Sequence, residues 1–581
     1  MYDSTAAHRK RPTPGLPMPT ISQLLAATVI VTTLTACTST WHKERADAQA
    51  YAAIAGKSDQ VPGMSADVSI DRNPQVMLVN FPLAGVAPPD FLGLEADSEA
   101  GARVISLDNA LELAFTYNRE YQLQKERLYL EALSLTLDRY QYMPIFSASA
   151  AGAYVWDHQS EFVQDADTMA MVPTGEILTE EYIQARSTLG SRLLLRGGGQ
   201  IALNLTSNFL RFVTGDSNQS ATSALIGSFT QPLLRGAGRE ADEALLQAER
   251  NLLYQLRDFT RYRKVLAVRV ASQYYTVLQA RDVARNNYQG LLATRASLER
   301  ERAFQAEGLR TLGQVARLEQ SALRRDLSWA RSITRYSNSL DSFKILVGLK
   351  ADDGIILDDA QMVLVTQAGM QSPDLTLEQA MEAALAARLD LFTRVDEVQD
   401  RARRIELAAD GFKPQLNLFV DAAVPAGRDN RLGDLDFRQT DYSAGLALDL
   451  PVDSMAQRSN YRRALIDYEG AVRSYEASVD AIKLQVLDAW RAMEEAERNY
   501  QISLASVALN ERRVEEAELR AELGLGDVQD TVDAQNDLTE ARTGLSEAIV
   551  SHNIAKLELW RDTGLLYVHE DGQWEEGTNE L

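Results

Sequence analysis

Two long stretches of the chain carry apolar residues at alternating spacings of three and four, the pattern of helices with one buried side. They run from Arg239 to Glu307 and from Ala456 to Glu522, without a proline. About 68 residues at ~1.5 Å each would give helices roughly 100 Å long, which we expect to form antiparallel coiled hairpins. The apolar stripes are Leu252, Leu256, Phe259, Leu266, Val270 and Val277 in the first stretch, and Leu465, Tyr468, Val472, Tyr475, Val479, Ile482, Val486, Ala489, Met493, Ala496 and Tyr500 in the second.

Two shorter segments, 223–231 and 442–450, alternate apolar and polar residues, which predicts β-strands. Each has about the 9–11 residues of a tilted membrane strand, although a pair of soluble β-hairpins would show the same pattern. Two hairpins cannot close a barrel, and open sheet edges are not tolerated in lipid. Membrane strands would therefore require several chains to share one barrel. One face of these strands holds Leu225, Gly227 and Phe229, or Tyr442, Leu446, Leu448 and Leu450, while Tyr154, Trp156, Tyr182 and Tyr442 suit a bilayer interface.

The chain repeats itself in order. Residues 105–118 resemble 375–388, and the match continues without a gap to Pro144 and Pro414, where a helical pattern gives way to a strand pattern. Later landmarks also correspond: Pro232 matches Pro451, and the turn at Gly308 matches the turn at Gly524. Each half therefore predicts a helix, strands, a long helix, a glycine turn and a second long helix.

The first half has an insertion between its two prolines. Pro144 and Pro232 enclose 87 residues, whereas Pro414 and Pro451 enclose 36. Residues 187–210 alternate around an Arg-Gly-Gly-Gly centre, which predicts a further hairpin. This hairpin either lengthens the barrel strands or adds strands. The acidic segment 157–181 is expected to be an exposed loop.

Composition narrows the possible functions. A net charge of −23 and a pI near 4.8 argue against binding nucleic acid, which needs a basic surface. The five histidines have no metal-ligand spacing, so no metal site is predicted. No P-loop, nucleophile elbow or HExxH motif is present, and the glycine-rich 196–200 lacks the Lys-Ser/Thr of a phosphate-binding loop. We therefore predict a protein that is not an enzyme, without catalytic residues or cofactors.

The single cysteine, Cys37, follows a basic region at 8–11 and an apolar run at 21–34. This arrangement resembles a bacterial lipoprotein signal, in which the cysteine becomes the lipidated (palmitate-bearing) N-terminus; an ordinary signal peptide that contains a cysteine is the alternative. Thr38 and Ser39 favour delivery to the outer membrane by the same resemblance. The polar residues 42–60 would link the lipid at the membrane surface to the rest of the chain.

Residues 104–565 resemble the outer-membrane efflux protein family, the TolC-like channels. The motifs that carry this resemblance are "TQPLLRGAGRE" (230–240), two Gly-Leu hairpin turns and the duplicated layout. The resemblance implies a mainly α-helical chain with membrane β-strands, which forms a homotrimer with one β-barrel and a periplasmic α-helical barrel. It also implies a periplasmic adaptor protein and an inner-membrane transporter as partners, and a role as the outer-membrane exit duct of an efflux or type I secretion system.

On this basis the chain divides into six parts. They are a signal peptide at 1–36, a lipid anchor and linker at 37–103, a first repeat at 104–349 (strands about 145–231, helical hairpin about 236–349), an equatorial connector at 350–374, a second repeat at 375–565 (strands about 415–450, helical hairpin about 453–563) and a C-terminal tail at 566–581.

The second hairpin turn, "ELGLGDVQDTVDAQ", places three acids after two glycines. Acids are favoured in the first turn of any helix, and that explanation remains open for Asp527. By resemblance to the family's tip motif, Asp530 and Asp533 would be pore-constriction residues, forming two rings of carboxylates that favour cations. Gln314 and Arg317 at the matching positions of the first hairpin suit a tip that does not line the pore. The expected adaptor contacts are Gly308, Leu309, Thr311, Gly524, Leu525 and Asp527.

A second function also fits the pattern. The chain could be a lipid-anchored periplasmic coiled-coil scaffold that never inserts its strands, although prolines at both strand boundaries of each repeat argue against it. The exported substrate and the energy source of the pump are not encoded in a passive duct.

Overall fold

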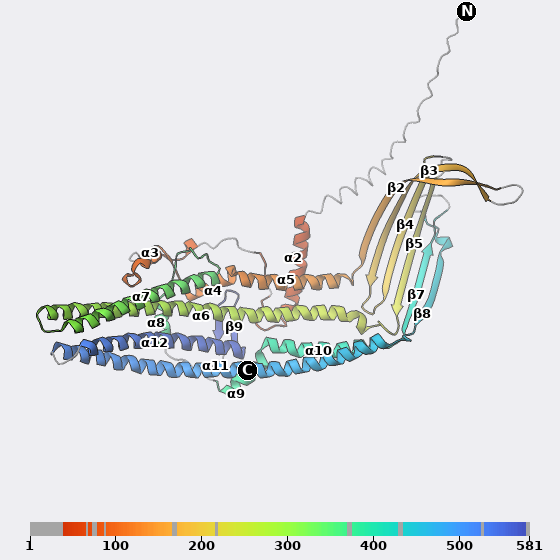
Figure 1. The fold of residues 1–581 in the computed structure, drawn as a ribbon. Helices are drawn as coiled ribbons and strands as arrows, with labels where there is room; N and C mark the ends of the chain where they lie inside the picture. Colours follow the sequence, from red (N-terminus) through yellow and green to blue (C-terminus); the bar gives the residue numbers. More distant parts are fainter. Residues whose placement is uncertain are drawn as a thin grey trace, which may run out of the picture.

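The computed structural model describes residues 39–576, apart from 66–67, 72–77, 86–88, 165–170, 215–218, 369–372, 374, 428–433 and 524–527. The chain is elongated (Figure 1): long helices run side by side, a curved β-sheet stands at one end, and the turns of the helical hairpins lie at the other. In the described part of the chain, no helix combines the length and the apolar character needed to cross a membrane.

The helical body contains the same four helices twice. The duplication was predicted, whereas the single helix expected before the strands of each half is in fact two helices, divided at Asn118 and at Arg388. In both halves the long third helix has 68 residues, which corresponds to roughly 100 Å. The first set comprises α4 (Leu107–Tyr117), α5 (Arg119–Tyr140), α6 (Arg239–Ala306) and α7 (Leu312–Leu346), and the second comprises α9 (Leu377–Ala387), α10 (Leu389–Asp410), α11 (Met455–Glu522) and α12 (Val528–Thr563).

The predicted apolar stripe of α6 is buried throughout, from Leu252 to Val277. On α11 the stripe is buried only between Ile482 and Ala496, where it packs on α9 and α12. The remaining stripe residues, 465–479 and Tyr500, are half-buried. Tyr475 and Val479 still pack on the cluster formed with α9 and α10, so helices of the same chain cover this part of the stripe only partly.

The sheet has six strands in the order β2-β3-β4-β5-β7-β8, and every neighbouring pair is antiparallel. The first repeat contributes four strands and the second contributes two. They are β2 (Ile145–Gln164), β3 (Met171–Leu194), β4 (Gln200–Phe212), β5 (Gln219–Pro232), β7 (Gln415–Val424) and β8 (Asp441–Asp449).

The insertion in the first repeat both adds and lengthens strands. The pair β3 and β4 is additional, with its turn at residues 195–199, and β2 and β3 continue together beyond the end of β4. The expectation of a loop at 157–181 was wrong, because the ladder between β2 and β3 continues through Asp157 and Glu180 to Gln164 and Met171. Main-chain pairing outweighs the acidic composition in this segment; only its residues 165–170 lie outside the described part.

Short strands and helices surround the middle of the helical body (Figure 1). Arg263 and Lys264 of α6 tie the C-terminal segment in place by donating to the carbonyl oxygens of Val568 (3.0 Å) and Gly564 (2.9 Å). The elements are β1 (Arg103–Ile105), which pairs in parallel with β6 (Ile355–Leu357), the helix α8 (Ala360–Ala368), and β9 (Leu566–Val568), which pairs with β10 (Trp574–Glu576).

The N-terminal segment packs on the helices. The polar stretch 42–60, predicted as a linker, lies mostly in α2 (Ser39–Ser58), whose Ala50, Ala53 and Ile54 are buried. The hydroxyl of Tyr129 on α5 donates to Asp47 at 2.5 Å. Small apolar residues therefore form the side of α2 that packs on the helical body, although most of the surrounding sequence is polar or charged. Cys37 lies outside the described residues.

The segment after α2 is held against α6 and α7. It includes a short helix, α3 (Ala96–Glu99), which ends in a buried carboxylate. That carboxylate of Glu99 accepts hydrogen bonds from Arg281 (2.9 Å) and Tyr336 (2.7 Å). The segment 37–103 is thus an integral part of the helical body over its described residues.

Candidate functional site: a two-faced sheet and the helix tips

The register of the sheet assigns each strand residue to one of two faces, because directly paired residues point to the same side. The row through Leu203 of β4 includes Ser191 of β3 and Gly227 of β5, and continues to Ala422 of β7 and Tyr442 of β8. The strand faces predicted from residues 223–231 and 442–450 therefore lie on one side of the sheet, together with Tyr154 and Trp156. The expectation for Tyr182 was wrong, because it pairs with Val155 and Phe212 and so points to the opposite side.

The face that contains Leu203 is apolar along all six strands. Eleven of its eighteen large apolar side chains are exposed in the single chain, up to 77% for Phe146 and 79% for Tyr442, and the other seven are half-buried. An uncovered apolar surface of this extent marks contact with lipid or protein. Its large apolar members are Phe146, Tyr154, Trp156, Ile183, Leu189, Leu193, Ile201, Leu203, Leu205, Phe209, Leu225, Phe229, Leu416, Leu418, Val420, Tyr442, Leu446 and Leu448.

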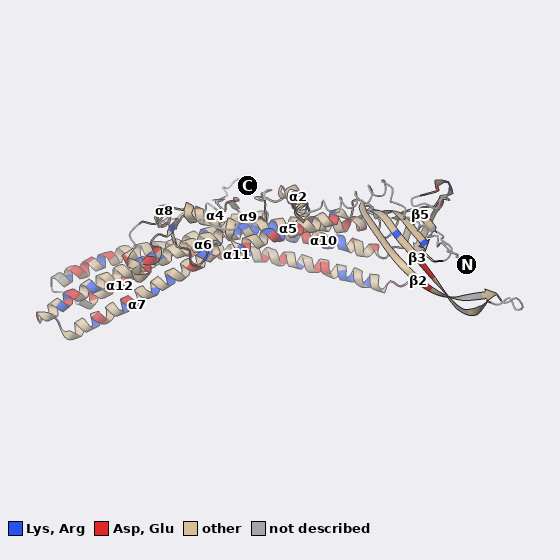
Figure 2. Cartoon of the chain, turned by 90° about the horizontal axis from the view of Figure 1, so that it is seen from above, with Lys and Arg blue, Asp and Glu red and all other residues tan. Residues whose placement is uncertain are grey.

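The opposite face is rich in polar side chains. Arg186 on this face donates from Nε to Oδ1 of Asn208 at 3.1 Å across the β3–β4 pair. An apolar face backed by a polar face is the alternation of a membrane barrel with a water-filled interior. Figure 2 shows that charged residues are frequent along the helices and sparse in the sheet. The polar members are Ser147, Ser149, Gln184, Arg186, Thr188, Arg192, Asn204, Thr206, Asn208, Thr222, Ser228, Asn417, Asp421, Asp441, Ser443 and Asp449.

The tip of the first helical hairpin is a tight turn between α6 and α7. Gly308 has a φ of +76°, a conformation that favours glycine, and Thr311 caps α7 in a reciprocal capping box with Gln314. Leu309 and Leu312 are exposed at this tip, where no residue of the described chain covers them. The turn therefore presents apolar side chains on a fixed backbone, although contact with an adaptor stays a prediction.

The tip of the second hairpin is described from Val528 onward, so Gly524, Leu525 and Asp527 lie outside the described residues. Asp530 is exposed in the first turn of α12, and Asp533 is half-buried and accepts a hydrogen bond from Gln529 Nε2 at 2.9 Å. Their location at the tip of the hairpin is compatible with the periplasmic entrance of a channel. That they line a pore constriction stays a prediction.

The two hairpins pack against each other near their tips. Val532 of α12 is buried in a small cluster with Leu298 of α6 and Leu318 of α7. Farther from the tip, Arg325 of α7 donates from Nε to Asn536 Oδ1 at 2.7 Å. The side of α12 that carries Val532 and Asn536 is therefore anchored to the first hairpin.

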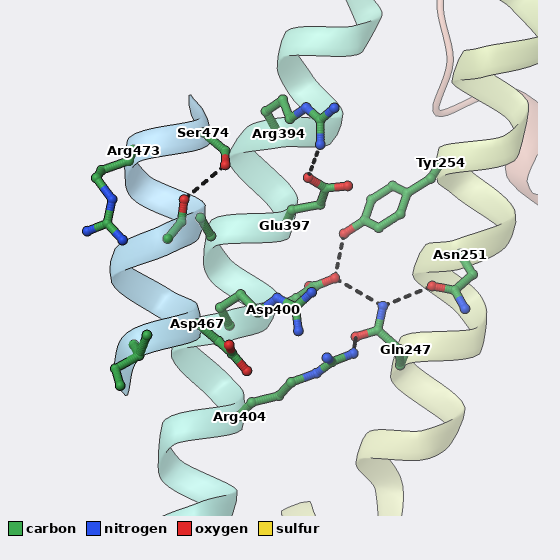
Figure 3. Close-up of a pocket in the computed structure, with 14 residues that line it drawn as sticks. Gln247, Asn251, Tyr254, Arg394, Glu397, Asp400, Arg404, Asp467, Arg473 and Ser474 are labelled. Atoms are coloured by element: carbon green, nitrogen blue, oxygen red, sulfur yellow. Dashed lines mark hydrogen bonds and ion pairs between the residues drawn. The ribbon is translucent and has the colours of Figure 1, made fainter. Parts of the chain in front are cut away.

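A polar pocket of about 830 Å³ lies between α6, α10 and α11 (Figure 3). The buried carboxylate of Asp400 at its wall accepts four hydrogen bonds, from Gln247 (3.1 Å), Arg250 (2.8 Å), Tyr254 (2.7 Å) and Arg403 (2.8 Å). Burial and the hydrogen bond to Asp400 raise the pKa of Tyr254, so its hydroxyl remains a donor. The arrangement pairs charges between helices without a nucleophile and base, so we assign it a structural role.

Sequence reasoning missed this cluster. The partners of Asp400 on α6 lie about 150 positions earlier in the chain. The only available signal was the presence of arginines on α6, such as Arg250 and Arg257, and aspartates on α10, such as Asp396 and Asp400. Charges of this kind also occur on solvated helix faces, so composition alone could not identify them.

His552 on α12 is buried, and its Nε2 has no hydrogen-bond partner among the described residues. Burial lowers its pKa, so the folded chain resists protonating it, whereas the unfolded chain takes up the proton near pH 6.5. Protonation of His552 in the unfolded chain therefore lowers the free energy of unfolding as the pH falls below 6.5, whereas above pH 6.5 it has little effect.

We expect the His552→Leu variant to lose less stability between pH 7 and pH 5.5 than the native chain, by up to about 1.2 kcal/mol. Urea unfolding of the detergent-solubilised protein at the two pH values measures this difference. Asn553→Leu on the same helix provides the control, since it removes no titratable group and should leave the pH dependence of stability unchanged. Identical pH dependence in His552→Leu and the native chain would contradict the interpretation.

Comparison with known proteins agrees with this geometry. Residues 380–564 match the model of the outer membrane efflux protein family. A search of curated proteins finds no match. Similar solved structures include a membrane protein from Pseudomonas aeruginosa (TM-score 0.58, 17% identity, 79% of this chain and 92% of that chain). They also include the CmeC outer membrane channel of Campylobacter jejuni (0.57, 14%, 87% and 96%) and the open MtrE outer membrane channel of Neisseria gonorrhoeae (0.54, 14%, 80% and 90%).

Proposed function

We propose that this chain, which carries an outer membrane efflux protein region and has the fold of TolC-like channels, forms the passive exit duct of a tripartite efflux or type I secretion system. The observation that carries this proposal is the six-stranded sheet, which is apolar on one face, polar on the other and open at both edges. Unpaired edges are costly in lipid, so the sheet needs copies of itself to close. Three copies would form one barrel in the outer membrane.

In this arrangement the helices extend from the membrane into the periplasm. Helices of 68 residues reach roughly 100 Å, which suits a duct that meets an adaptor and an inner-membrane transporter at its far end. The half-buried stripe on α11 supports helix packing between chains, since helices of the same chain cover its apolar residues only partly. The duct itself performs no chemistry. Its partners select the cargo and supply the energy for its transport.

The exposed leucines at the first tip support an adaptor contact. Leu309 and Leu312 are uncovered on a rigid turn, and such residues commonly anchor protein interfaces. A photo-reactive amino acid at position 309 should crosslink to a periplasmic adaptor in cells. The same group at Leu246, an exposed position near the sheet end of α6, should not crosslink to it.

We also propose that Cys37 is lipidated and anchors the chain to the membrane. Metabolic labelling with an alkynyl palmitate should mark the native chain, and Cys37→Ala should remove the label. A label that survives this substitution would place the lipid elsewhere.

The carboxylates at the second tip provide the functional test. In a trimer, Asp530 and Asp533 would form two rings of three carboxylates at the entrance, which attract cations. The double variant Asp530→Asn with Asp533→Asn should weaken the block of single-channel current by multivalent cations by at least about tenfold, equivalent to roughly 1.4 kcal/mol.

The matched control is Asp326→Asn on α7, which removes an exposed carboxylate from the outer hairpin. It should leave the block unchanged. If the double variant is blocked as strongly as the native channel, the two aspartates do not line the entrance.

A further inference from the structure

We propose that the inserted strands β3 and β4 form part of the barrel wall, so that three copies of the chain close a barrel of 18 strands, with β8 of one copy paired to β2 of the next. The proposal rests on the trimeric channel described above and adds the number of strands, the pairing edge and the width of the outer-membrane exit. It excludes an inserted hairpin that folds into the lumen or stands outside the barrel.

Continuous pairing is the first argument. β3 pairs with β2 on one side and with β4 on the other, and the β3–β4 ladder runs from Tyr182 and Phe212 to Leu194 and Gln200 without a register shift. β4 in turn pairs with β5 from Gln200 to Arg211. A hairpin that formed a plug or a flap would leave β2 and β5 to pair with each other, and instead the insertion separates them.

The side-chain pattern of the inserted strands is the second argument. β4 places Leu203 and Leu205 on the apolar face and Asn204 and Thr206 on the polar face, in phase with its neighbours. This alternation is required of a strand with lipid on one side and water on the other. A lumenal plug would be expected to lack a continuous apolar face.

The turn between β3 and β4 is fixed at the helical end of the sheet. The carbonyl oxygen of Gly197 accepts from Gln231 Nε2 (3.0 Å) and from the main-chain N–H of Gly238 (3.2 Å), immediately before α6. Gly198 has a φ of +85°, and a Cβ there would lie 2.5 Å from the carbonyl oxygen of Gly236. The inserted hairpin is therefore built into the junction between the sheet and the helices.

The two open edges are compatible with closure. Five antiparallel pairings in series leave β2 and β8 running in opposite directions, so β8 of one chain meets β2 of the next in an antiparallel pair. β2 pairs only with β3, and β8 only with β7, among the described residues. An odd number of strands per chain would instead force a parallel pair at every boundary between chains.

The two additional strands in each chain determine the diameter of the proposed barrel. With strands about 4.8 Å apart and tilted by about 40°, a ring of 18 strands has a backbone diameter of roughly 36 Å, compared with roughly 24 Å for 12 strands. The inserted strand β3 also brings Arg186 and Arg192 to the polar face. The exit would therefore be a wide, water-filled passage for bulky polar cargo, comparable to barrels of 16–18 strands that leave an aqueous channel.

Cryo-electron microscopy of the native full-length chain in lipid nanodiscs tests this directly, since the strands of a barrel can be counted. We expect one closed ring of 18 strands, about 36 Å across. A closed trimeric ring of 12 strands, with β3 and β4 folded inside or outside it, would overturn this inference and leave the channel proposal intact. The absence of any shared ring in the bilayer would overturn the channel proposal itself.

A deletion provides a second measurement. Removal of residues 171–218 takes out β3, its turn and β4 and joins β2 directly to β5, which keeps the strand number even. The ring should narrow by about one third, to roughly 24 Å. An unchanged ring diameter in this variant would show that the inserted strands are not part of the wall.

Discussion

An arginine at position 205 is expected to prevent most chains from assembling in the membrane, whereas an arginine at position 206 is expected to be tolerated. Leu205 and Thr206 are adjacent near the middle of β4, so the strand presents them to opposite faces. Leu205 lies between Leu189 and Leu225 on the apolar face, and Thr206 lies between Thr188 and Ala224 on the polar face. The same substitution therefore samples the two sides of the sheet at the same depth.

The expected difference follows from the cost of placing a charge in hydrocarbon. Arginine on the lipid side of a membrane strand costs about 2–4 kcal/mol at the middle of the bilayer, and a symmetric trimer would incur this cost three times. On the polar face, which would line a water-filled lumen in the proposed barrel, the guanidinium of Thr206→Arg would remain hydrated. Both variants retain the strand's main-chain hydrogen bonds, so a difference between them reports the environment of the side chain.

Urea unfolding of the protein reconstituted in lipid vesicles measures the effect on free energy. Leu205→Arg should lower the unfolding midpoint strongly, and Thr206→Arg should stay close to the native value. Equal losses in the two variants would contradict a sheet with one lipid face. A larger loss in Thr206→Arg would reverse the assignment of the faces.

Loss of the Asp400 carboxylate is expected to be the most damaging change in the helical body. Asp400 accepts four hydrogen bonds from α6 and α10, and Asp400→Ala leaves Arg250 and Arg403 without this partner in a partly buried site. Removing one member of a buried charge pair typically costs about 3–5 kcal/mol, and we expect about 3 because both arginines retain some contact with water.

The matched control is Glu397→Ala, one turn earlier on α10. Glu397 pairs with Arg394 in an exposed ion pair, which should contribute less than about 1 kcal/mol. The temperature at which the detergent-solubilised protein loses helical circular dichroism measures both effects. A drop in Asp400→Ala no greater than in Glu397→Ala would show that the carboxylate is not a structural centre of the body.

Much of the helical architecture could be predicted because it depends on local signals. Apolar periodicity located the long helices, and the corresponding prolines and glycines located their ends and turns. Helix α2 was missed because its docking side consists of the small residues Ala50 and Ala53 with a single Ile54, within a charged stretch. Small residues contribute little to apolar periodicity, although they permit close packing.

The β-sheet was only partly predictable. The faces of β5 and β8 followed from alternation, but the sequence left open whether the insertion added strands, because the partners of a strand are set by pairing across the sheet. Asp400 was missed for a related reason, since its importance comes from residues about 150 positions away. For Asp530 and Asp533 the tip location was predictable, whereas their part in a pore requires the assembled channel.

The mass and the mode of extraction of the native protein test the shared barrel most directly. We expect the protein in the outer-membrane fraction, where it should resist extraction with high salt and be released by detergent as a complex with the mass of three chains. Heating should convert this complex to single chains on a gel. Release of a single chain by salt would contradict a shared barrel and favour a lipid-anchored scaffold without a pore.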